Sequence, residues 1–275
     1  MPELPEVETT IKGLNILINK KVIKVSVHTK KLRYNIPLRL NAILKDQSIL
    51  AVERIAKYIL IKFNNNNSAI IHLGMSGRLK MCKSNFKREK HDHVILFFKN
   101  NYTLIFNDPR KFGFIDIVEP VKINKQKYFF RLGVDALSRK LTANHIYAKI
   151  HKSSVPIKQI LLNQHIVAGI GNIYASEILY DAKVSPFIKG RDLIFDQIQL
   201  LVKSIKKILN NAIKSGGSSI RDYRSADGTL GNFQSKFKVY GKDGRKVSKY
   251  TIHKSFQYGR VTYYCPELQK EQNSN

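Results

Sequence analysis

Cysteine, acidic side chains and long apolar runs are all scarce in this sequence. Its two cysteines, Cys82 and Cys265, allow one disulfide at most and cannot build a zinc site from four cysteines. No stretch approaches the roughly 18 uninterrupted apolar residues of a transmembrane helix, and no charged segment followed by an apolar one opens the chain. We therefore expect a cytoplasmic protein that is not exported and that binds no membrane.

The shortage of acidic residues leaves a strong positive charge. Of 275 residues, 48 are Lys or Arg and 20 are Asp or Glu, which gives a formal net charge of +28 spread along the chain. The 43% hydrophobic content excludes a disordered basic tail and is enough for two domains with cores. A polyanion such as a nucleic acid is the natural partner. Charge alone would favour a non-enzymatic nucleic-acid-binding protein.

The first half of the chain has the pattern of one helix followed by a β-sandwich. Val7, Ile11, Leu14 and Ile18 recur at helical spacing. Runs rich in Val, Ile and aromatic residues then alternate with turn signals. The expected strands are 21–28, 48–63, 68–73, 93–98, 102–106 and 112–118. Many short strands at this spacing predict a sandwich.

After about residue 125 the apolar spacing becomes helical, and the last forty residues look like a β-hairpin. The expected helices are 143–151, 156–165, 172–183 and 191–214. Asp243-Gly244 and Tyr258-Gly259 are hairpin turn signals. The predicted organisation is an α+β protein with a β-sandwich domain and flanking helices (1–125), a linker (126–140), a helical domain (141–235), a hairpin (236–268) and a tail (269–275).

The opening residues Met1-Pro-Glu-Leu-Pro-Glu-Val-Glu8 permit two interpretations. Removal of Met1 would leave Pro2 with a free secondary amine, which can attack a carbonyl carbon and form an electron-withdrawing iminium. Glu3 would then be a neighbouring acid or base. The simpler interpretation is a helix start, with prolines in the first turn and acidic residues at the positive end of the dipole.

Lys57 and two glycine-containing turns are further candidates. Lys57 is a cation within an otherwise apolar strand, where a solvated lysine is the simpler explanation. The turns His72–Arg78 and Asn107–Gly113 would present Met75, Arg110 and Phe112. Singly, each turn indicates only a hairpin. Together they would provide a flexible apolar side chain, a guanidinium and an aromatic wedge, which are suited to opening a base stack.

Two segments of the second half are candidates for phosphate binding. Gly169-Ile-Gly171 precedes a predicted helix that Asn172 can cap, and backbone amides at a helix N-terminus bind phosphate. An ordinary helical hairpin would look the same. Arg260 lies beside the turn of the terminal hairpin, where it could clasp a phosphate or remain a surface arginine.

These motifs, in this order and approximate spacing, resemble the bacterial formamidopyrimidine-DNA glycosylases. The resemblance runs from Pro2 to about Cys265 and rests on the opening Pro-Glu-Leu-Pro-Glu-Val-Glu, His72–Gly77, Asp108–Gly113 and Gly169–Glu177. It implies a β-sandwich joined to a helix-two-turn-helix domain, with damaged duplex DNA held in the positive cleft between them. It also implies a monomeric glycosylase and lyase that excises 8-oxoguanine and formamidopyrimidines.

The resemblance also assigns roles to residues. It places the nucleophile at Pro2, the acid/base carboxylate at Glu3 and the catalytic-site lysine at Lys57. Met75, Arg110 and Phe112 would fill the space that the flipped base leaves. The remaining DNA contacts are expected from His91, Arg110, Lys158, Asn172 and Arg260.

The C-terminal hairpin departs from the family pattern. Members commonly close it around zinc with four cysteines, but here only Cys265 matches such a position, so we expect a zincless hairpin with no cofactor. Cross-strand aromatic pairs contribute roughly 0.2–1 kcal/mol each. We therefore expect aromatic side chains to stabilise this hairpin, namely Tyr250, Phe256, Tyr258, Tyr263 and Tyr264.

The base specificity stays open at this point. A sister enzyme of the same superfamily excises oxidised pyrimidines, and Leu4 favours the purine enzyme. The glycine-punctuated segment from about 217 to 232 is expected to form a loop against the flipped base. A non-enzymatic architectural DNA-binding protein is disfavoured by the joint presence of Pro2, Glu3 and Lys57.

Overall fold

The computed structural model describes residues 2–83, 86–119, 126, 128–218, 226 and 230–270. These form two compact units, each described separately below. Unit 1 comprises Met1–Phe130 with Ile213–Gln234, and unit 2 comprises Arg131–Ala212 with Ser235–Asn275. No helix within the described part is both long and apolar enough to cross a bilayer.

Unit 1 is a sandwich of two four-stranded antiparallel sheets, which confirms the predicted fold class. One sheet has the order β1-β6-β7-β5, from Val22–Val27, Asp92–Phe98, Tyr102–Asn107 and Arg78–Lys83. The other has the order β2-β3-β4-β8, from Ile49–Ile55, Tyr58–Phe63, Ser68–His72 and Phe114–Val118. Side chains of both sheets share one core, in which Phe63, Phe98 and Phe106 are among the largest fully buried residues.

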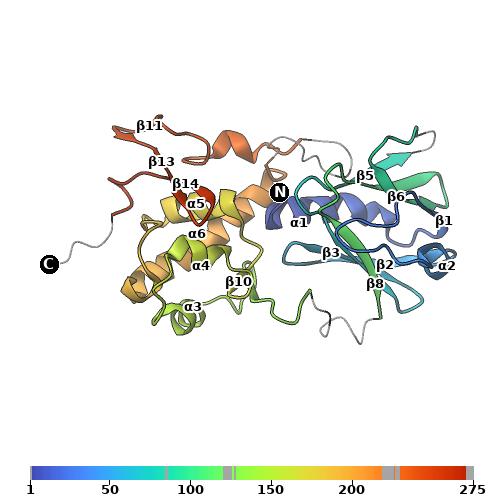
Figure 1. Ribbon diagram of the computed structural model, residues 1–275, viewed down its shortest axis with the longest axis horizontal. Helices are drawn as coiled ribbons and strands as arrows, with labels where there is room; N and C mark the ends of the chain where they lie inside the picture. Colours follow the sequence, from blue (N-terminus) through green and yellow to red (C-terminus); the bar gives the residue numbers. More distant parts are fainter. Residues whose placement is uncertain are drawn as a thin grey trace. The chain divides into compact units, whose positions relative to one another are not determined.

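Helix α1 (Leu4–Leu14) lies against this sandwich (Figure 1). Its residues Val7, Ile11 and Leu14 are buried in the common core, as their spacing predicts. A 3-10 turn, η1 (Asn15–Leu17), follows it, and the short helix α2 (Leu40–Leu44) precedes β2. Helix α2 and strand β5 were not predicted. In β5 Leu79 is buried and Met81 packs partly buried against the same core, which is an apolar alternation of only two residues.

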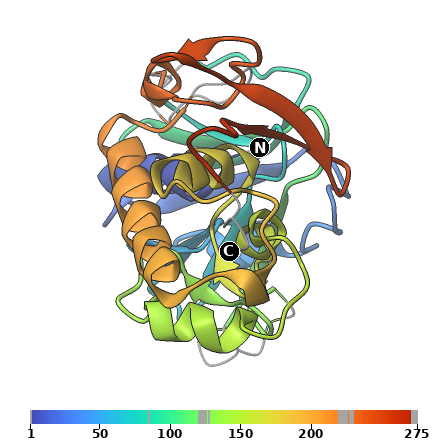
Figure 2. The ribbon, with the colours of Figure 1, turned by 90° about the vertical axis from the view of Figure 1, so that its left-hand side faces the viewer.

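Unit 2 is helical with small β elements (Figure 2). Its helices are α3 (Ala143–Ile150), α4 (Ile157–Leu162), α5 (Asn172–Asp181) and α6 (Phe195–Lys214, which ends in unit 1), with a 3-10 turn η3 (Gly190–Asp192). Strands β9 (Val134–Asp135) and β10 (Val167–Ala168) pair in parallel. The 3-10 turn η4 (Phe233–Lys236) leads into two hairpins, β11 (Lys246–Val247) with β12 (Tyr250–Thr251), and β13 (His253–Gln257) with β14 (Arg260–Tyr264).

The segment 213–234 belongs to unit 1, although the sequence places it in the helical domain. Ala226 is buried in the sandwich core, and its carbonyl accepts a hydrogen bond from Met81 N (2.7 Å). The expected base-contacting loop falls mostly on 219–225 and 227–229, which lie outside the described residues.

Candidate active site and nucleic-acid interface

The N-terminus has the predicted helix start, with Pro2 and Glu3 directly before the first residue of α1. Glu3 is the N-cap of α1, and Pro5 lies in the first turn. The Glu3 side chain accepts from Glu6 N, while Glu3 N donates to Glu6 Oε2 (2.9 Å) in a reciprocal capping box. Pro2 is buried, and Glu3 and Glu6 are each 2% exposed. The helix start therefore holds Pro2 and Glu3 in a fixed position.

The carboxylate of Glu6 has a second function that the sequence did not reveal. Its Oε1 accepts hydrogen bonds from Ser218 N (2.8 Å) and Ser218 Oγ (3.0 Å). Neighbouring Gly217 has a φ of +76°, and a Cβ there would lie 3.1 Å from Glu6 Oε1. Glu6 thus joins the start of the chain to the start of the segment expected to touch the base.

Lys57 lies in a tight turn and not within a strand as predicted. Ile55 pairs with Tyr58, so the run 48–63 is two strands joined by Ala56-Lys57. Ala56 adopts a φ of +52°, and Arg54 stabilises this conformation by donating to Ala56 O (3.2 Å) and to Glu8 Oε2 of α1 (2.6 Å). Lys57 is only 7% exposed. The turn contains no Gly, Pro, Asn or Asp, which explains why it was missed.

His72 lies at the end of β4 and opens the first predicted glycine turn. The sequence alone predicts no separate role for its side chain. Burial, together with the positive charges of Lys57 and Arg33, lowers the pKa of His72 to about 4. Its Nδ1 accepts from Gly74 N (3.0 Å), which leaves the proton of the neutral ring on Nε2. His72 is therefore a neutral hydrogen-bond donor close to Lys57.

The two predicted glycine turns are packed against each other. Gly74 has a φ of +62°, and a Cβ there would lie 2.4 Å from Phe112 C and Gly113 N. Asp108 joins the turns, since its carboxylate accepts from Ser76 Oγ (2.6 Å) and Gly113 N (2.7 Å). The two turns therefore form one rigid support.

This support presents the expected apolar and cationic side chains to solvent. Met75 and Phe112 are each 44% exposed. The Arg110 guanidinium lies 4.8 Å from the centroid of the Phe112 ring. His91 borders the same turn, because its carbonyl accepts from Asp108 N (3.1 Å). The structure thus brings Met75, His91, Arg110 and Phe112 to one part of unit 1.

In unit 2, Asn172 opens α5 but does not cap it as predicted. Gly171 is the N-cap residue, and Asn172 Nδ2 donates to Val261 O of the hairpin (2.9 Å). Within the described part of the chain, Asn172 Oδ1 is buried and has no hydrogen-bond partner. The preceding turn is shaped by Gln164, whose side chain accepts from Gly169 N (2.9 Å) and donates to Ile170 O (2.8 Å).

Lys158, which the resemblance places among the DNA contacts, is bound to the hairpin. It is fully buried, and its Nζ donates to Thr262 Oγ1 (2.7 Å) and Val261 O (2.9 Å). Thr262 Oγ1 in turn donates to Gln257 Oε1 (2.9 Å). A buried polar network therefore anchors the hairpin, whereas Arg260 remains exposed beside its turn.

The prediction that five aromatic side chains stabilise the hairpin by packing on it is mostly wrong. Phe256 is 71% exposed and Tyr258 is 72% exposed, so neither packs on it. The ring contacts lie at the other end of β14. There Tyr264 lies 4.9 Å from Phe187, and Tyr263 lies 5.1 Å from Tyr240, measured between ring centroids.

Glu177 of α5 fixes the segment that leads into the hairpin region. Its carboxylate is 2% exposed and accepts hydrogen bonds from the backbone NH groups of Lys238 (2.8 Å), Val239 (3.0 Å) and Tyr240 (2.8 Å). Burial raises the pKa of Glu177, and these three donors oppose the rise. The sequence contains no signal for this role beyond an acidic residue on the buried face of a helix.

The relationship to known proteins agrees with this geometry. The formamidopyrimidine-DNA glycosylase N-terminal domain matches residues 1–115, and the formamidopyrimidine-DNA glycosylase H2TH domain matches residues 132–224. The chain is 45% identical over 272 residues to the formamidopyrimidine-DNA glycosylase of Zymomonas mobilis, covering 98% of this chain and 100% of that protein. The chain belongs to the formamidopyrimidine-DNA glycosylase family. It is therefore a DNA glycosylase of base excision repair.

Other relatives support the same assignment. The formamidopyrimidine-DNA glycosylase of Rickettsia africae is 40% identical over 272 residues, covering 98% of this chain and 99% of that protein. A mutant of the Lactococcus lactis enzyme, in complex with a Fapy-dG containing DNA, superposes with a TM-score of 0.91 at 34% identity, over 98% of this chain and 100% of that one. The complex of the Lactococcus lactis enzyme with an abasic site containing DNA gives 0.90 at 35% identity, with the same coverage.

The zinc site common in the formamidopyrimidine-DNA glycosylase family does not fit the residues present here. Cys82 lies on β5 of unit 1 and Cys265 is buried at the end of the hairpin. Cys265 Sγ contacts Glu267, and Cys265 N donates to Gln269 Oε1 (2.8 Å). Among the residues that the structure describes, no group of three His, Cys, Asp or Glu side chains could hold a metal ion.

Proposed function

We propose that this glycosylase excises oxidised purines, namely 8-oxoguanine and formamidopyrimidines, from duplex DNA and then cuts the strand at the abasic sugar. The observation that carries the proposal is the buried placement of Pro2 and Glu3 at the start of α1. Complexes of the related Lactococcus lactis enzyme with Fapy-dG DNA and abasic-site DNA support the choice of substrate.

The proposed chemistry begins at the Pro2 nitrogen after Met1 has been removed. The target nucleotide is flipped out, because C1′ cannot be attacked while its base is stacked and paired. The Pro2 amine forms a bond to C1′, and the base departs with its bonding electrons and takes up a proton. Glu3 transfers the proton that opens the sugar ring, which leaves an iminium between Pro2 and the sugar.

The iminium acts as an electron sink for strand cleavage. It acidifies the C2′ proton, whose loss expels the 3′ phosphate in a β-elimination. A second, δ-elimination expels the 5′ phosphate, so that the strand is cut on both sides of the sugar. Lys57 and the neutral donor His72 are proposed to hold the neighbouring phosphate, and Lys57 also opposes protonation of the Pro2 amine.

The rigid pair of turns is proposed to open the base stack. Met75, Arg110 and Phe112 would fill the space left by the flipped nucleotide, with His91 contacting the adjacent strand.

In unit 2, Asn172 and Arg260 are proposed to bind phosphates. Lys158 would act indirectly, because its buried ammonium donates to Val261 O and Thr262 Oγ1 and so positions the strand that carries Arg260. The direct contact of Lys158 with DNA stays a prediction beside this anchoring role.

We further propose that the protein acts as a monomer in the cytoplasm and without zinc. The absence of a four-cysteine set and the polar network under the hairpin support the zincless proposal. Metal analysis of the purified protein, together with activity after chelator treatment, tests it. Stoichiometric zinc, or activity lost to the chelator, would contradict it.

Base specificity is tested by cleavage of matched duplexes. Duplexes with one 8-oxoguanine or one thymine glycol are compared at equal enzyme concentration, with undamaged duplex as the control. The proposal expects faster cleavage of the 8-oxoguanine strand, with products that carry phosphate at both new ends. Preference for thymine glycol would support the sister enzyme that excises oxidised pyrimidines, and binding without any cleavage would indicate an architectural protein.

A further inference from the structure

A loop of unit 1 presents a pair of cations to which no ligand has been assigned so far. Lys31 and Arg33 are exposed and alternate with Leu32 and Ile36, which are each 4% exposed and belong to the sandwich core. Backbone hydrogen bonds close the loop, among them one from Leu32 N to Tyr34 O (3.0 Å). The apolar anchors therefore fix both cations on the outer side.

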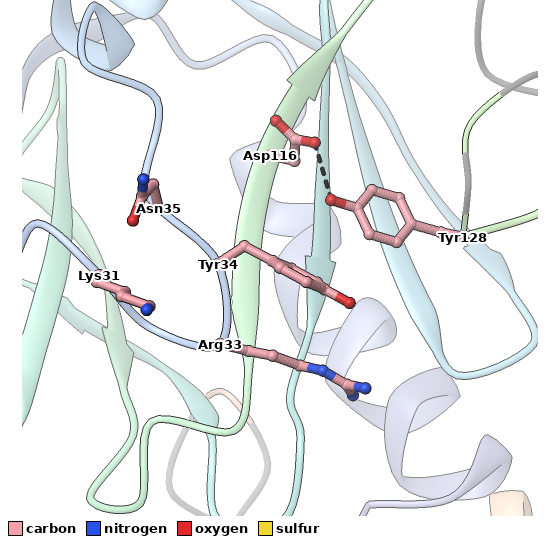
Figure 3. A pocket seen from close by; sticks show the side chains of 6 residues that line it. All are labelled: Lys31, Arg33, Tyr34, Asn35, Asp116 and Tyr128. Atoms are coloured by element: carbon pink, nitrogen blue, oxygen red, sulfur yellow. Dashed lines mark hydrogen bonds between the residues drawn. The ribbon is translucent and has the colours of Figure 1, made fainter.

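These cations line a pocket of about 440 Å³ between the loop and β8 (Figure 3). This volume lies within the range of small-ligand sites, roughly 300–1,000 Å³. Aromatic walls lower the local dielectric, so that the positive charges act more strongly there than on an open surface. The other lining residues are Tyr34, Asn35, Asp116 and Tyr128.

The acidic residue of the pocket does not neutralise the cations. Asp116 Oδ2 accepts from the Tyr128 hydroxyl (3.0 Å), and Asp116 Oδ1 accepts from Ile117 N (2.9 Å). Burial and the neighbouring Asp116 charge raise the pKa of Tyr128, so its hydroxyl stays protonated and continues to donate. Within the described part of the chain, neither Lys31 nor Arg33 forms an ion pair. In Figure 3 the Arg33 guanidinium points away from the Asp116 carboxylate.

Arg33 also adjoins the residues expected to hold DNA. Arg33 N donates to Gly113 O (3.0 Å), and a Cβ on Gly113 would lie 2.6 Å from His72 O. Burial raises the pKa of Tyr58, the residue after Lys57, and the charge of Arg33 opposes that rise. Arg33 is therefore linked through Gly113 to His72, and the charges of both Arg33 and Lys57 act on the His72 ring.

We propose that Arg33, with Lys31 beside it, binds a backbone phosphate of the DNA strand and adds this contact to the one proposed for Lys57 and His72. A guanidinium suits this ligand because it can donate two parallel hydrogen bonds to one phosphate. The inference rests on the proposed function, since it requires a DNA strand held along unit 1.

The test compares Arg33→Gln with Arg39→Gln, an exposed arginine of the same connection that does not line the pocket. Each full-length variant binds a duplex containing a tetrahydrofuran abasic analogue at several salt concentrations. Loss of one phosphate contact should weaken binding by Arg33→Gln at least about tenfold and reduce the slope of log K against log salt by about 0.9. Arg33→Lys should recover most of the slope but less of the affinity, and Arg39→Gln should match the native protein.

A methylphosphonate scan of the duplex locates the phosphate. Neutralising one phosphate at a time should reveal a single position that weakens the native protein but has no further effect on Arg33→Gln, as expected for a coupled pair. Additive losses at every position would overturn the inference, and so would equal slopes for Arg33→Gln and Arg39→Gln. Failure of the native protein to bind or cleave damaged duplex would instead overturn the proposed function.

Discussion

The paired turns of unit 1 and the hairpin β13–β14 of unit 2 both carry side chains that are proposed to contact DNA, but they are held in different ways. The turns touch through their backbones, with Gly74 against Phe112 and Gly113, and Asp108 hydrogen-bonds to both. The hairpin instead rests on side chains, above all on the buried Lys158 ammonium. Close backbone packing makes the paired turns rigid. The hydrogen bonds that hold the hairpin can instead be removed one at a time by substituting single side chains.

This difference predicts that Gly74→Ala has the largest structural effect. A left-handed backbone costs an alanine about 1–2 kcal/mol, and at Gly74 the new Cβ also collides with backbone 2.4 Å away. Gly241→Ala is the matched control, because Gly241 has a φ of +73° but no atom within 4 Å of the added Cβ. Thermal unfolding should show a clearly larger loss for Gly74→Ala. Equal losses would mean that the turns are not locked together.

Lys158→Met is expected to have the next largest effect, confined to the hairpin. It removes the buried donor to Thr262 Oγ1 and one of two donors to Val261 O, which keeps its bond from Asn172 Nδ2, at a cost of about 1–3 kcal/mol. Hydrogen exchange of the amides in 253–264 should accelerate while exchange in β3 and β6 is unchanged. Lys149→Met, an exposed lysine on α3, serves as the control. Unchanged exchange in the hairpin would contradict the anchoring role.

The pKa of His72 gives a prediction about pH. Because the ring binds its proton only near pH 4 when folded but near pH 6.5 when unfolded, this residue destabilises the fold as pH falls from about 6.5 to 4. Above about pH 6.5 the contribution of His72 to the free energy of unfolding is fully present and no longer changes with pH. Its ring signals in an NMR titration should therefore stay those of a neutral imidazole from about pH 8 to 5. A midpoint near 6.5 would show that His72 is not held as a neutral donor.

The smallest effect is expected from the exposed aromatic side chains of the hairpin. Phe256→Ser should change the free energy of unfolding by less than about 0.5 kcal/mol, as for an ordinary surface substitution. Tyr264→Ser should cost more, because it removes the edge contact with Phe187 as well as buried area. A loss for Phe256→Ser as large as that for Tyr264→Ser would show that the exposed aromatic side chains do stabilise the hairpin.

The sequence alone predicts elements that depend on local patterns, such as apolar spacing and turn-forming residues. Apolar spacing located α1 and most strands correctly, because Val7, Ile11 and Leu14 alternate with polar positions in the expected period. Local motifs also identified the turns around Gly74 and Phe112. The turn at Ala56-Lys57 was missed because it is stabilised by Arg54 and not by a turn-forming residue.

Long-range polar contacts could not be predicted from the sequence. Nothing near Lys158 in the chain indicates that its ammonium meets Thr262, and nothing near Glu6 indicates Ser218. Nor could the aromatic residues of the hairpin be assigned to a buried or an exposed face, because β13 has no clear apolar alternation. These contacts depend on how distant segments meet in three dimensions.

The proposed role of Pro2 is tested most directly by borohydride trapping on abasic duplex DNA, combined with mass analysis of the N-terminal peptide. We expect the purified protein to begin at Pro2 and borohydride to fix a covalent adduct on that residue. Protein that retains Met1 should give no adduct, because its Pro2 nitrogen is an amide. An adduct on an internal lysine of the native protein, or full strand cleavage with Met1 retained, would contradict the account.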